Sequence, residues 1–124
     1  MLLYHASSWE FDKVDLSVRV DNGHHANSGL GLFCVKKYDP YIKGFGNLVY
    51  ELTISDDAVI EDMPTEELSL MCRGSNSHRD RAWFEAERLR RAKTSDIIRL
   101  FDNVGEQYIL LDERVVIGLR KLQQ

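Results

Sequence analysis

A chain of 124 residues with 44% hydrophobic and 29% charged residues has the composition of one soluble globular domain, residues 1–124, and is long enough to bury a core. Its net charge of -4 at pH 7 excludes a general attraction to nucleic acids or anionic membranes. The first residues resemble no secretion signal, and no apolar run approaches the roughly 18 residues of a membrane span. We therefore expect a cytoplasmic protein, in its own cell or in a host.

The two cysteines, Cys34 and Cys72, predict neither a disulfide framework nor a metal motif. Each lies in an apolar stretch, GLFCV and LSLMC, so we expect two buried free thiols. No cysteine or carboxylate lies at a spacing that predicts a metal site with the histidines, and we expect no metal.

The first half of the chain predicts three strands. Residues 2–7 (LLYHAS) form an apolar run that ends in serines, and residues 30–37 are rich in aromatic and β-branched side chains. Residues 47–55 (NLVYELTIS) alternate between apolar and polar positions, which is typical of a half-buried strand. Residues 9–27 read as a loop, and the proline near the start of residues 39–45 favours a short helix there.

The second half predicts two helices followed by three strands. The helices span residues 63–74 and 77–93, and the strands span residues 96–101, 106–112 and 114–122. This order lacks the regular alternation of strand and helix that a parallel doubly wound sheet needs. We therefore expect an α+β domain with mostly antiparallel strands.

The longer predicted helix has Ala82, Ala86 and Leu89 on one face, and Glu87 followed by Arg91 forms a supporting ion pair. Cations outnumber anions around it. We favour a solvated face with intrahelical ion pairs over a landing surface for an acidic partner or a nucleic acid. The cations are Arg79, Arg81, Arg88, Arg90, Arg91 and Lys93, and the anions are Asp80, Glu85 and Glu87.

Three short motifs follow one another along nearly the whole chain. They are YHAS, then GLGLF with its following helix and GFGNLVYELTI strand, and finally EQYILLDERVV. In this order they resemble the H-G-[ST] signature, the G-x-G-[ILV]-[YF] segment and the late catalytic strand of ADP-ribosyltransferases of the diphtheria-toxin and poly(ADP-ribose) polymerase type. The resemblance implies a split, mostly antiparallel sheet with flanking helices, and NAD as co-substrate without a metal.

The resemblance implies roles for three consecutive residues of the first motif. His5 would hold the hydroxyls of the adenosine ribose. Ala6 stands where the family has a glycine whose backbone holds the nicotinamide carboxamide, and Ser7 matches a hydroxyl that supports the same amide. A lone histidine in an apolar strand is usually a hydrogen-bonded structural residue, so only the order of the three motifs favours a chemical role for His5.

In the second motif, Phe33 matches the aromatic residue that packs on the nicotinamide ring, where tyrosine is commoner. Gly31 belongs to the same NAD-binding strand; taken alone, it indicates only a turn or a close backbone approach. Tyr41 or Phe45, from the predicted short helix, would close the other face of the ring. Phe33 without its context predicts a core residue.

In the third motif, Gln107 falls where the family has its catalytic glutamate. Glutamine keeps a hydrogen bond to a ribose hydroxyl but carries no charge to stabilise the positive charge that develops as nicotinamide leaves. Glu106 is adjacent, and neighbours on a strand point to opposite faces. A bulge or another register would make Glu106 the catalytic residue instead.

The resemblance therefore predicts a mono-ADP-ribosyltransferase whose acceptor is a protein or a nucleic acid, of a size that suits a phage-encoded or toxin-like effector. Two alternatives stay open. One is a catalytically silent binding module with the same fold, and the other is an enzyme similar to RNA 2′-phosphotransferases, which would need a basic phosphate pocket. The sequence indicates neither the acceptor nor the oligomeric state.

Overall fold

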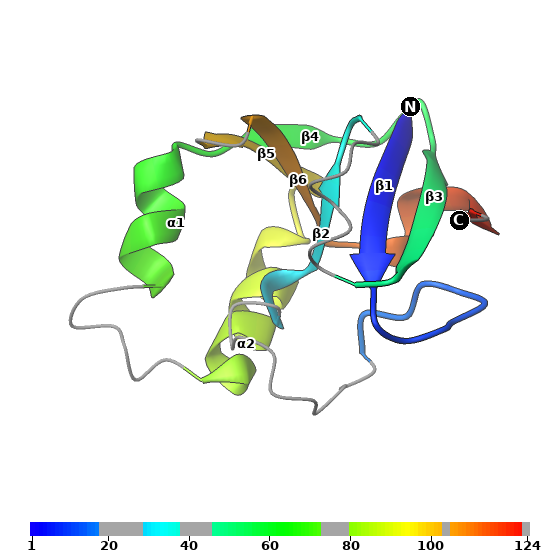
Figure 1. Ribbon diagram of the computed structural model, residues 1–124. Coiled ribbons are helices and arrows are strands. Elements are labelled where there is room, and N and C mark those ends of the chain that lie inside the picture. Colours follow the sequence, from blue (N-terminus) through cyan, green and yellow to red (C-terminus); the bar gives the residue numbers. More distant parts are fainter. Residues whose placement is uncertain (18–28, 38–45, 73–79, 103–104, 123–124) are drawn as a thin grey trace.

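The computed structural model describes residues 1–17, 29–37, 46–72, 80–102 and 105–122. Its architecture is α+β, as predicted, with a curled, mostly antiparallel sheet of seven strands and two α-helices in the described part (Figure 1). None of the described helices is long and apolar enough to cross a membrane.

The strands lie side by side in the order β4-β5-β6-β2-β1-β3-β7. Every described pairing is antiparallel except that of β4 with β5, which is parallel. The N-terminal strand thus lies inside the sheet, with partners on both sides. The strands are β1 (Leu2–Ser7), β2 (Leu32–Val35), β3 (Leu48–Ile54), β4 (Ile60–Asp62), β5 (Ile97–Asp102), β6 (Gly105–Leu110) and β7 (Val116–Lys121).

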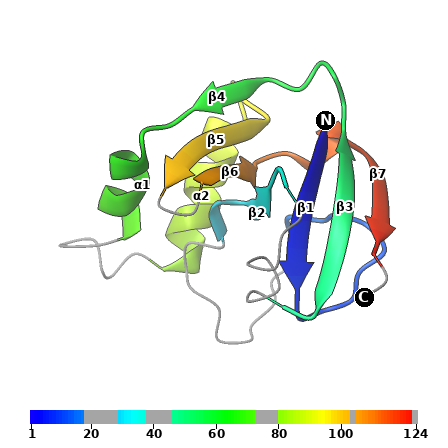
Figure 2. The ribbon, with the colours of Figure 1, turned by 45° about the horizontal axis from the view of Figure 1, so that its top comes forward.

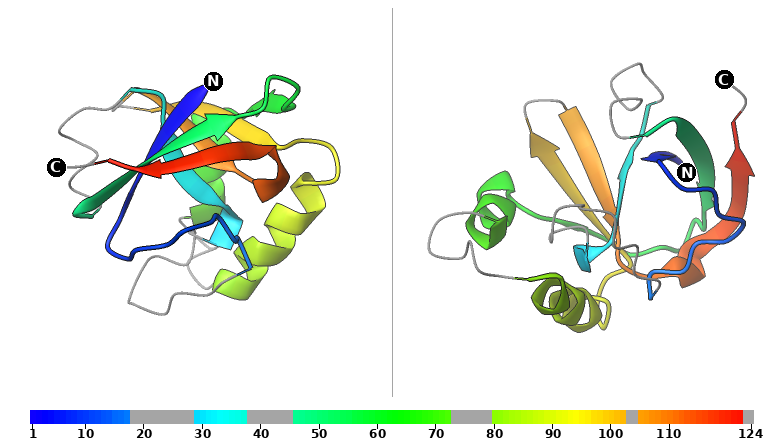
Figure 3. Two further views of the ribbon diagram at one scale, coloured as in Figure 1. Left: turned by 90° about the vertical axis from the view of Figure 1, so that its right-hand side faces the viewer. Right: turned by 60° about the horizontal axis from the view of Figure 1, so that its bottom comes forward.

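The pairing between β1 and β2 is short, and it divides the sheet into two halves. β1 is in register with β3 from Leu2 to Ser7, but with β2 only at Tyr4 and Val35. β2 in turn pairs along its whole length with β6. The half formed by β1, β3 and β7 turns away from the half formed by β2, β6, β5 and β4 (Figure 3). We call the β1–β2 junction the seam.

Strand alternation distributes the core over the two faces of the sheet. One face, which we call the inner face, carries a core cluster that includes Leu3, Cys34, Tyr50 and Tyr108. The opposite face, which we call the helix face, packs against the two helices α1 (Thr65–Cys72) and α2 (Arg81–Arg91). Both helices lie beside the half of the sheet that contains β4, β5 and β6 (Figure 2). The buried residues of this second cluster are Leu30, Met63, Met71, Phe84, Ile98, Leu100, Ile109 and Leu111.

Helix α2 turns a different face to the core from the one that the sequence predicted. The Asp80 side chain caps its first turn by accepting a hydrogen bond of 2.9 Å from the backbone N–H of Trp83. Phe84 and Arg88 are the buried positions, whereas Leu89 is 58% exposed. The prediction of an apolar Ala82–Ala86–Leu89 face was wrong, because the bulky Phe84 ring fills the space under the sheet.

Arg88 was wrongly grouped with the solvated cations of this helix. It is buried, and its Nη1 donates to the carbonyl oxygen of Leu111 over 3.3 Å.

The strand predicted over residues 30–37 is confirmed in its centre, while β4 was missed. The expectation that Cys34 is a buried free thiol is confirmed, and burial raises its pKa. The predicted helix over residues 39–45 and the side chain of Cys72 lie outside what the structure describes.

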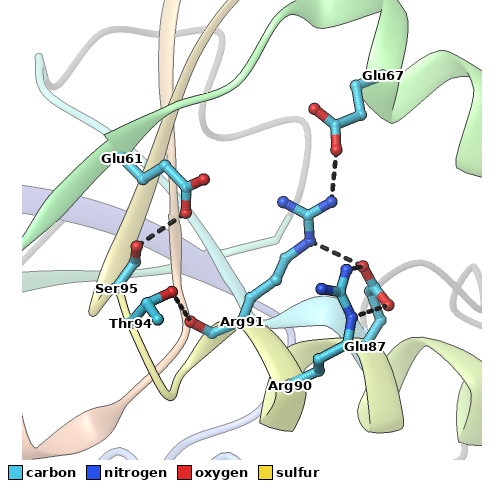
Figure 4. Close-up of polar contacts among 7 residues, drawn as sticks. All are labelled: Glu61, Glu67, Glu87, Arg90, Arg91, Thr94 and Ser95. Carbon is cyan, nitrogen blue, oxygen red and sulfur yellow. Dashed lines mark hydrogen bonds and ion pairs between the residues drawn. The ribbon is translucent and has the colours of Figure 1, made fainter.

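An ion-pair network joins the two helices (Figure 4). Arg91 donates from Nη2 to Glu67 of α1 over 2.5 Å, and from Nε to Glu87 of its own helix over 2.9 Å. The predicted pair of Glu87 with Arg91 is therefore confirmed. Arg90 also donates to Glu87. The side chains of Arg91 and Glu87 are both mostly buried. Through the pair of Arg91 with Glu67, the network links α1 to the last turn of α2.

Replacing Glu87 with glutamine is expected to lower the free energy of unfolding by about 0.5–1 kcal/mol at pH 7. The hydrogen bond from Arg90 and the pairing with Arg91 lower the pKa of Glu87, against an opposing effect of burial. A pKa that is lower in the folded state adds stability above the unfolded value, and that stability is lost as the pH falls through the folded value. The deficit of Glu87→Gln should thus shrink in urea unfolding at about pH 3. Asp56→Asn, in an exposed turn, is the control; an equal deficit at both pH values would contradict the assignment.

Candidate functional site

His5 lies at the seam, where the ladder between β1 and β2 ends. Its Nδ1 is 2.7 Å from the carbonyl oxygen of Phe33 on β2. A carbonyl oxygen only accepts hydrogen bonds, so Nδ1 carries the proton and donates it. In the neutral ring Nε2 is then the acceptor atom. The side chain of His5 therefore extends the contact between the two strands beyond the last backbone pair, Tyr4 and Val35.

Two aromatic residues lie beside the His5 ring on the inner face. The centroid of the Phe11 ring is 6.3 Å from that of His5, with the planes tilted by 53°. Phe11 stacks on Tyr50 at 4.0 Å, and the hydroxyl of Tyr50 accepts a hydrogen bond of 3.0 Å from the backbone N–H of Phe11. Tyr50 is directly opposite His5 in the β1–β3 register. Residues from β1, β3 and the segment after β1 thus meet at His5.

Ala6 and Ser7 complete the first motif. Ala6 is 7% exposed and packs with Val49. In the described residues, no residue other than glycine has a positive φ, so alanine is unstrained at the position where the resembling family has glycine. The hydroxyl of Ser7 donates to the carbonyl oxygen of Trp9 over 2.8 Å and accepts from its N–H over 2.9 Å. Ser7 therefore shapes the turn that follows β1.

Phe33 and Gln107 share one face of the sheet. The β2–β6 register pairs Phe33 with Ile109 and Val35 with Gln107, without a shift. Phe33 packs against the cluster on the helix face, and Gln107, two residues before Ile109, alternates to that face as well. His5 alternates with Leu3 to the inner face. The structure therefore brings His5 to the backbone of Phe33, while the side chains of Phe33 and Gln107 lie on the other side.

Glu106 lies on the inner face, opposite Gln107. It accepts a hydrogen bond of 2.5 Å from the hydroxyl of Tyr108, and Nη1 of Arg99 is 3.9 Å away. Burial, together with Glu106, raises the pKa of Tyr108 to about 12. The β6 registers with β2 and β5 contain no bulge that would reverse these directions. Gln107, and not Glu106, therefore shares a face with Phe33.

Gly31 allows β2 to approach β6 closely. Its φ is 156°, and a Cβ at this position would lie 2.3 Å from the carbonyl oxygen of Leu110. The close backbone approach that the sequence indicated is therefore confirmed. Tyr41 and Phe45, the expected partners of Phe33 around nicotinamide, lie outside the described residues.

Sequence reasoning missed Phe11 and Tyr50 as neighbours of His5. Tyr50 lies in the strand that the alternation predicted, but the pattern did not indicate which strand would pair with β1. Phe11 falls in the predicted loop, where no periodicity marks an inward side chain.

A polar hollow lies away from His5 and contains none of the expected site residues. It is lined by Ser55, Asp57, Asp96, Arg114 and Val115. Among the described residues, no group of three or more His, Cys, Asp or Glu side chains could hold a metal ion.

Comparison with known proteins gives one informative result. No model of a protein family matches the chain, and no curated protein matches it. A solved structure described as the crystal structure of an anti-CRISPR protein does match, with a TM-score of 0.55. The fold is shared with an anti-CRISPR protein. The match covers 98% of this chain and 95% of the other at 14% identity, so it extends over the whole architecture and shows the fold alone.

Proposed function

We propose that this chain binds NAD at the seam and transfers ADP-ribose to a single acceptor group of a protein or nucleic acid. The observation that supports this most is the hydrogen bond between the His5 ring and the Phe33 carbonyl. It joins the first two motifs of the ADP-ribosyltransferase resemblance in space, although they are far apart in the chain. The described register of β1 with β2 ends at Tyr4 and Val35. NAD bound at the seam would therefore contact His5 on one face of the sheet and Phe33 and Gln107 on the other.

In the proposed reaction, the bond between nicotinamide and C1 of ribose breaks, and nicotinamide leaves with the bonding electron pair. A nucleophilic atom of the acceptor forms a new bond to C1 and loses its proton to solvent. Nε2 of His5 accepts a hydrogen bond from a ribose hydroxyl, and the ring of Phe33 packs on nicotinamide. Gln107 donates or accepts a hydrogen bond at the other ribose.

The anti-CRISPR protein with the same fold supports a more specific target. Its description assigns it to the proteins that oppose CRISPR defence. We extend the proposal accordingly: the chain acts as a phage-encoded effector in the bacterial cytoplasm, and the modified acceptor belongs to a defence complex of the host. ADP-ribose adds two negative phosphates, so its attachment near a nucleic-acid site would repel the nucleic acid there.

A catalytically silent module is the second candidate, and Gln107 is the residue that favours it. An uncharged side chain at this position removes the strongest electrostatic contribution to leaving-group departure. An enzyme similar to RNA 2′-phosphotransferases is less supported, because it would need arginines to bind a phosphate. Five described arginines are already paired with carboxylates, namely Arg81, Arg91, Arg99, Arg114 and Arg120.

The proposal is tested with NAD labelled in its adenylate half and incubated with the protein and a bacterial lysate that contains CRISPR complexes. We expect label to become fixed to a macromolecule, and digestion with protease or nuclease identifies its class. His5→Ala and Gln107→Ala should lose at least about 90% of the label, because each removes a hydrogen bond made to a ribose. A wild-type protein that neither binds nor consumes NAD would refute the transferase, and NAD-independent binding to the defence complex would support the silent module.

A further inference from the structure

The segment that follows β1 is attached to the sheet beside His5 at three places. The Ser7 hydroxyl holds both backbone groups of Trp9, Glu10 pairs with Lys121 of β7 over 2.5 Å, and Phe11 contacts Tyr50 through its ring and its N–H. This segment therefore reaches back over the inner face of the β1–β3–β7 half.

The ring of Phe11 in this segment lies next to the ring of His5. Its orientation is determined from below by Tyr50, which is 1% exposed and anchored in β3. The separation of 6.3 Å with a 53° tilt is a geometry in which aromatic rings attract each other. His5 is thus held from two sides, by the Phe33 carbonyl at Nδ1 and by the Phe11 ring at its side.

A histidine that accepts a ribose hydroxyl at Nε2 needs its proton on Nδ1 and its ring in one orientation. The Phe33 carbonyl determines which nitrogen is protonated, but one hydrogen bond still permits rotation of the ring about that bond. The packed Phe11 ring limits this rotation. We infer that Phe11, held by Tyr50, is a positioning residue that orients His5 toward NAD, an inference that rests on the proposed function.

The test compares wild type with Phe11→Leu, which keeps an apolar side chain but removes the ring, and with Tyr50→Phe, which keeps the stack but removes the acceptor for the Phe11 N–H. Phe101→Leu, at a residue that is 59% exposed on β5, is the matched control. Nitrogen chemical shifts of the His5 ring report the tautomer, and NAD titration and steady-state kinetics report Kd, KM and kcat.

We expect Phe11→Leu to give a mixture of His5 tautomers and to raise Kd and KM for NAD by roughly ten-fold, the equivalent of about one net hydrogen bond, with a smaller change in kcat. Tyr50→Phe should change the same quantities in the same direction by less, and Phe101→Leu should change none. If wild type binds NAD and Phe11→Leu keeps one tautomer and the same affinity, the positioning role is wrong while the transferase survives. If wild type does not bind NAD, the proposed function itself fails.

Discussion

Replacing Gln107 with glutamate is expected to increase the rate at which NAD is consumed by about 100-fold. The side chain is partly exposed and lies on the same face of the sheet as Phe33, so a carboxylate there costs little desolvation. A negative charge near the ribose would stabilise the positive charge that develops as nicotinamide leaves. The rate of nicotinamide release, measured for wild type and Gln107→Glu at saturating NAD, checks this expectation.

Glu106→Gln provides the matched control for this change. It alters the neighbouring residue by the reverse substitution, but on the inner face, where Tyr108 donates to the carboxylate. We expect nicotinamide release to change by less than about two-fold, because Glu106 does not share a face with Phe33 and its carboxylate is bonded to Tyr108. A loss of rate in Glu106→Gln together with no gain in Gln107→Glu would exchange the roles of the two residues.

Replacing Gly31 with alanine is expected to lower the free energy of unfolding by at least about 3 kcal/mol, a large fraction of the stability of a small domain. The new Cβ would lie 2.3 Å from the carbonyl oxygen of Leu110 and 2.8 Å from Cγ2 of Ile109. The first of these atoms belongs to the backbone of β6 and cannot turn aside. Relief of the clash requires β2 to move away from β6, which would displace one of the two strands that form the seam.

Chemical denaturation measured by circular dichroism checks this expectation, with Gly118→Ala as the control. Gly118, on β7, also lies close to a neighbour, but a Cβ there would meet only the side chain of Thr53, at 3.2 Å. A shift of a few tenths of an ångström in that side chain is enough to relieve the contact, so a change below about 1 kcal/mol is expected. Equal losses in the two variants would show that the approach of β2 to β6 is not special.

The strands were predictable from sequence wherever burial produced a strict pattern. β1 and β3 were recognised because their residues alternate or form short apolar runs. β4 was missed since its residues, Ile60–Asp62, are all exposed, and its described strand partner is β5, with which it pairs in parallel. The buried face of α2 was misassigned because Ala82, Ala86 and Leu89 have the helical spacing of an apolar face. The residues that are buried are the aromatic Phe84 and the long Arg88.

The candidate site was predictable as a set of motifs but not as an arrangement. The sequence places His5 and Phe33 in different strands. Nothing in the local sequence determines that the His5 ring bonds to the backbone carbonyl of Phe33. The choice between Glu106 and Gln107 likewise depended on the register of β6 with β2, which long-range pairing decides. Phe11 comes from a segment without periodicity, so only the three-dimensional structure connects it to His5.

The position of β1 inside the sheet, with partners on both sides, has a consequence for how the chain folds during synthesis. β1 is made before any of its partners, and its pairing with β3 becomes available once Ile54 has been added. β2 must wait for β6, and β3 for β7, and both of these strands come from the last quarter of the chain. A nascent chain therefore exposes unpaired strand edges on both halves until the residues of β6 and β7 have been added. Such non-local pairing favours slow folding.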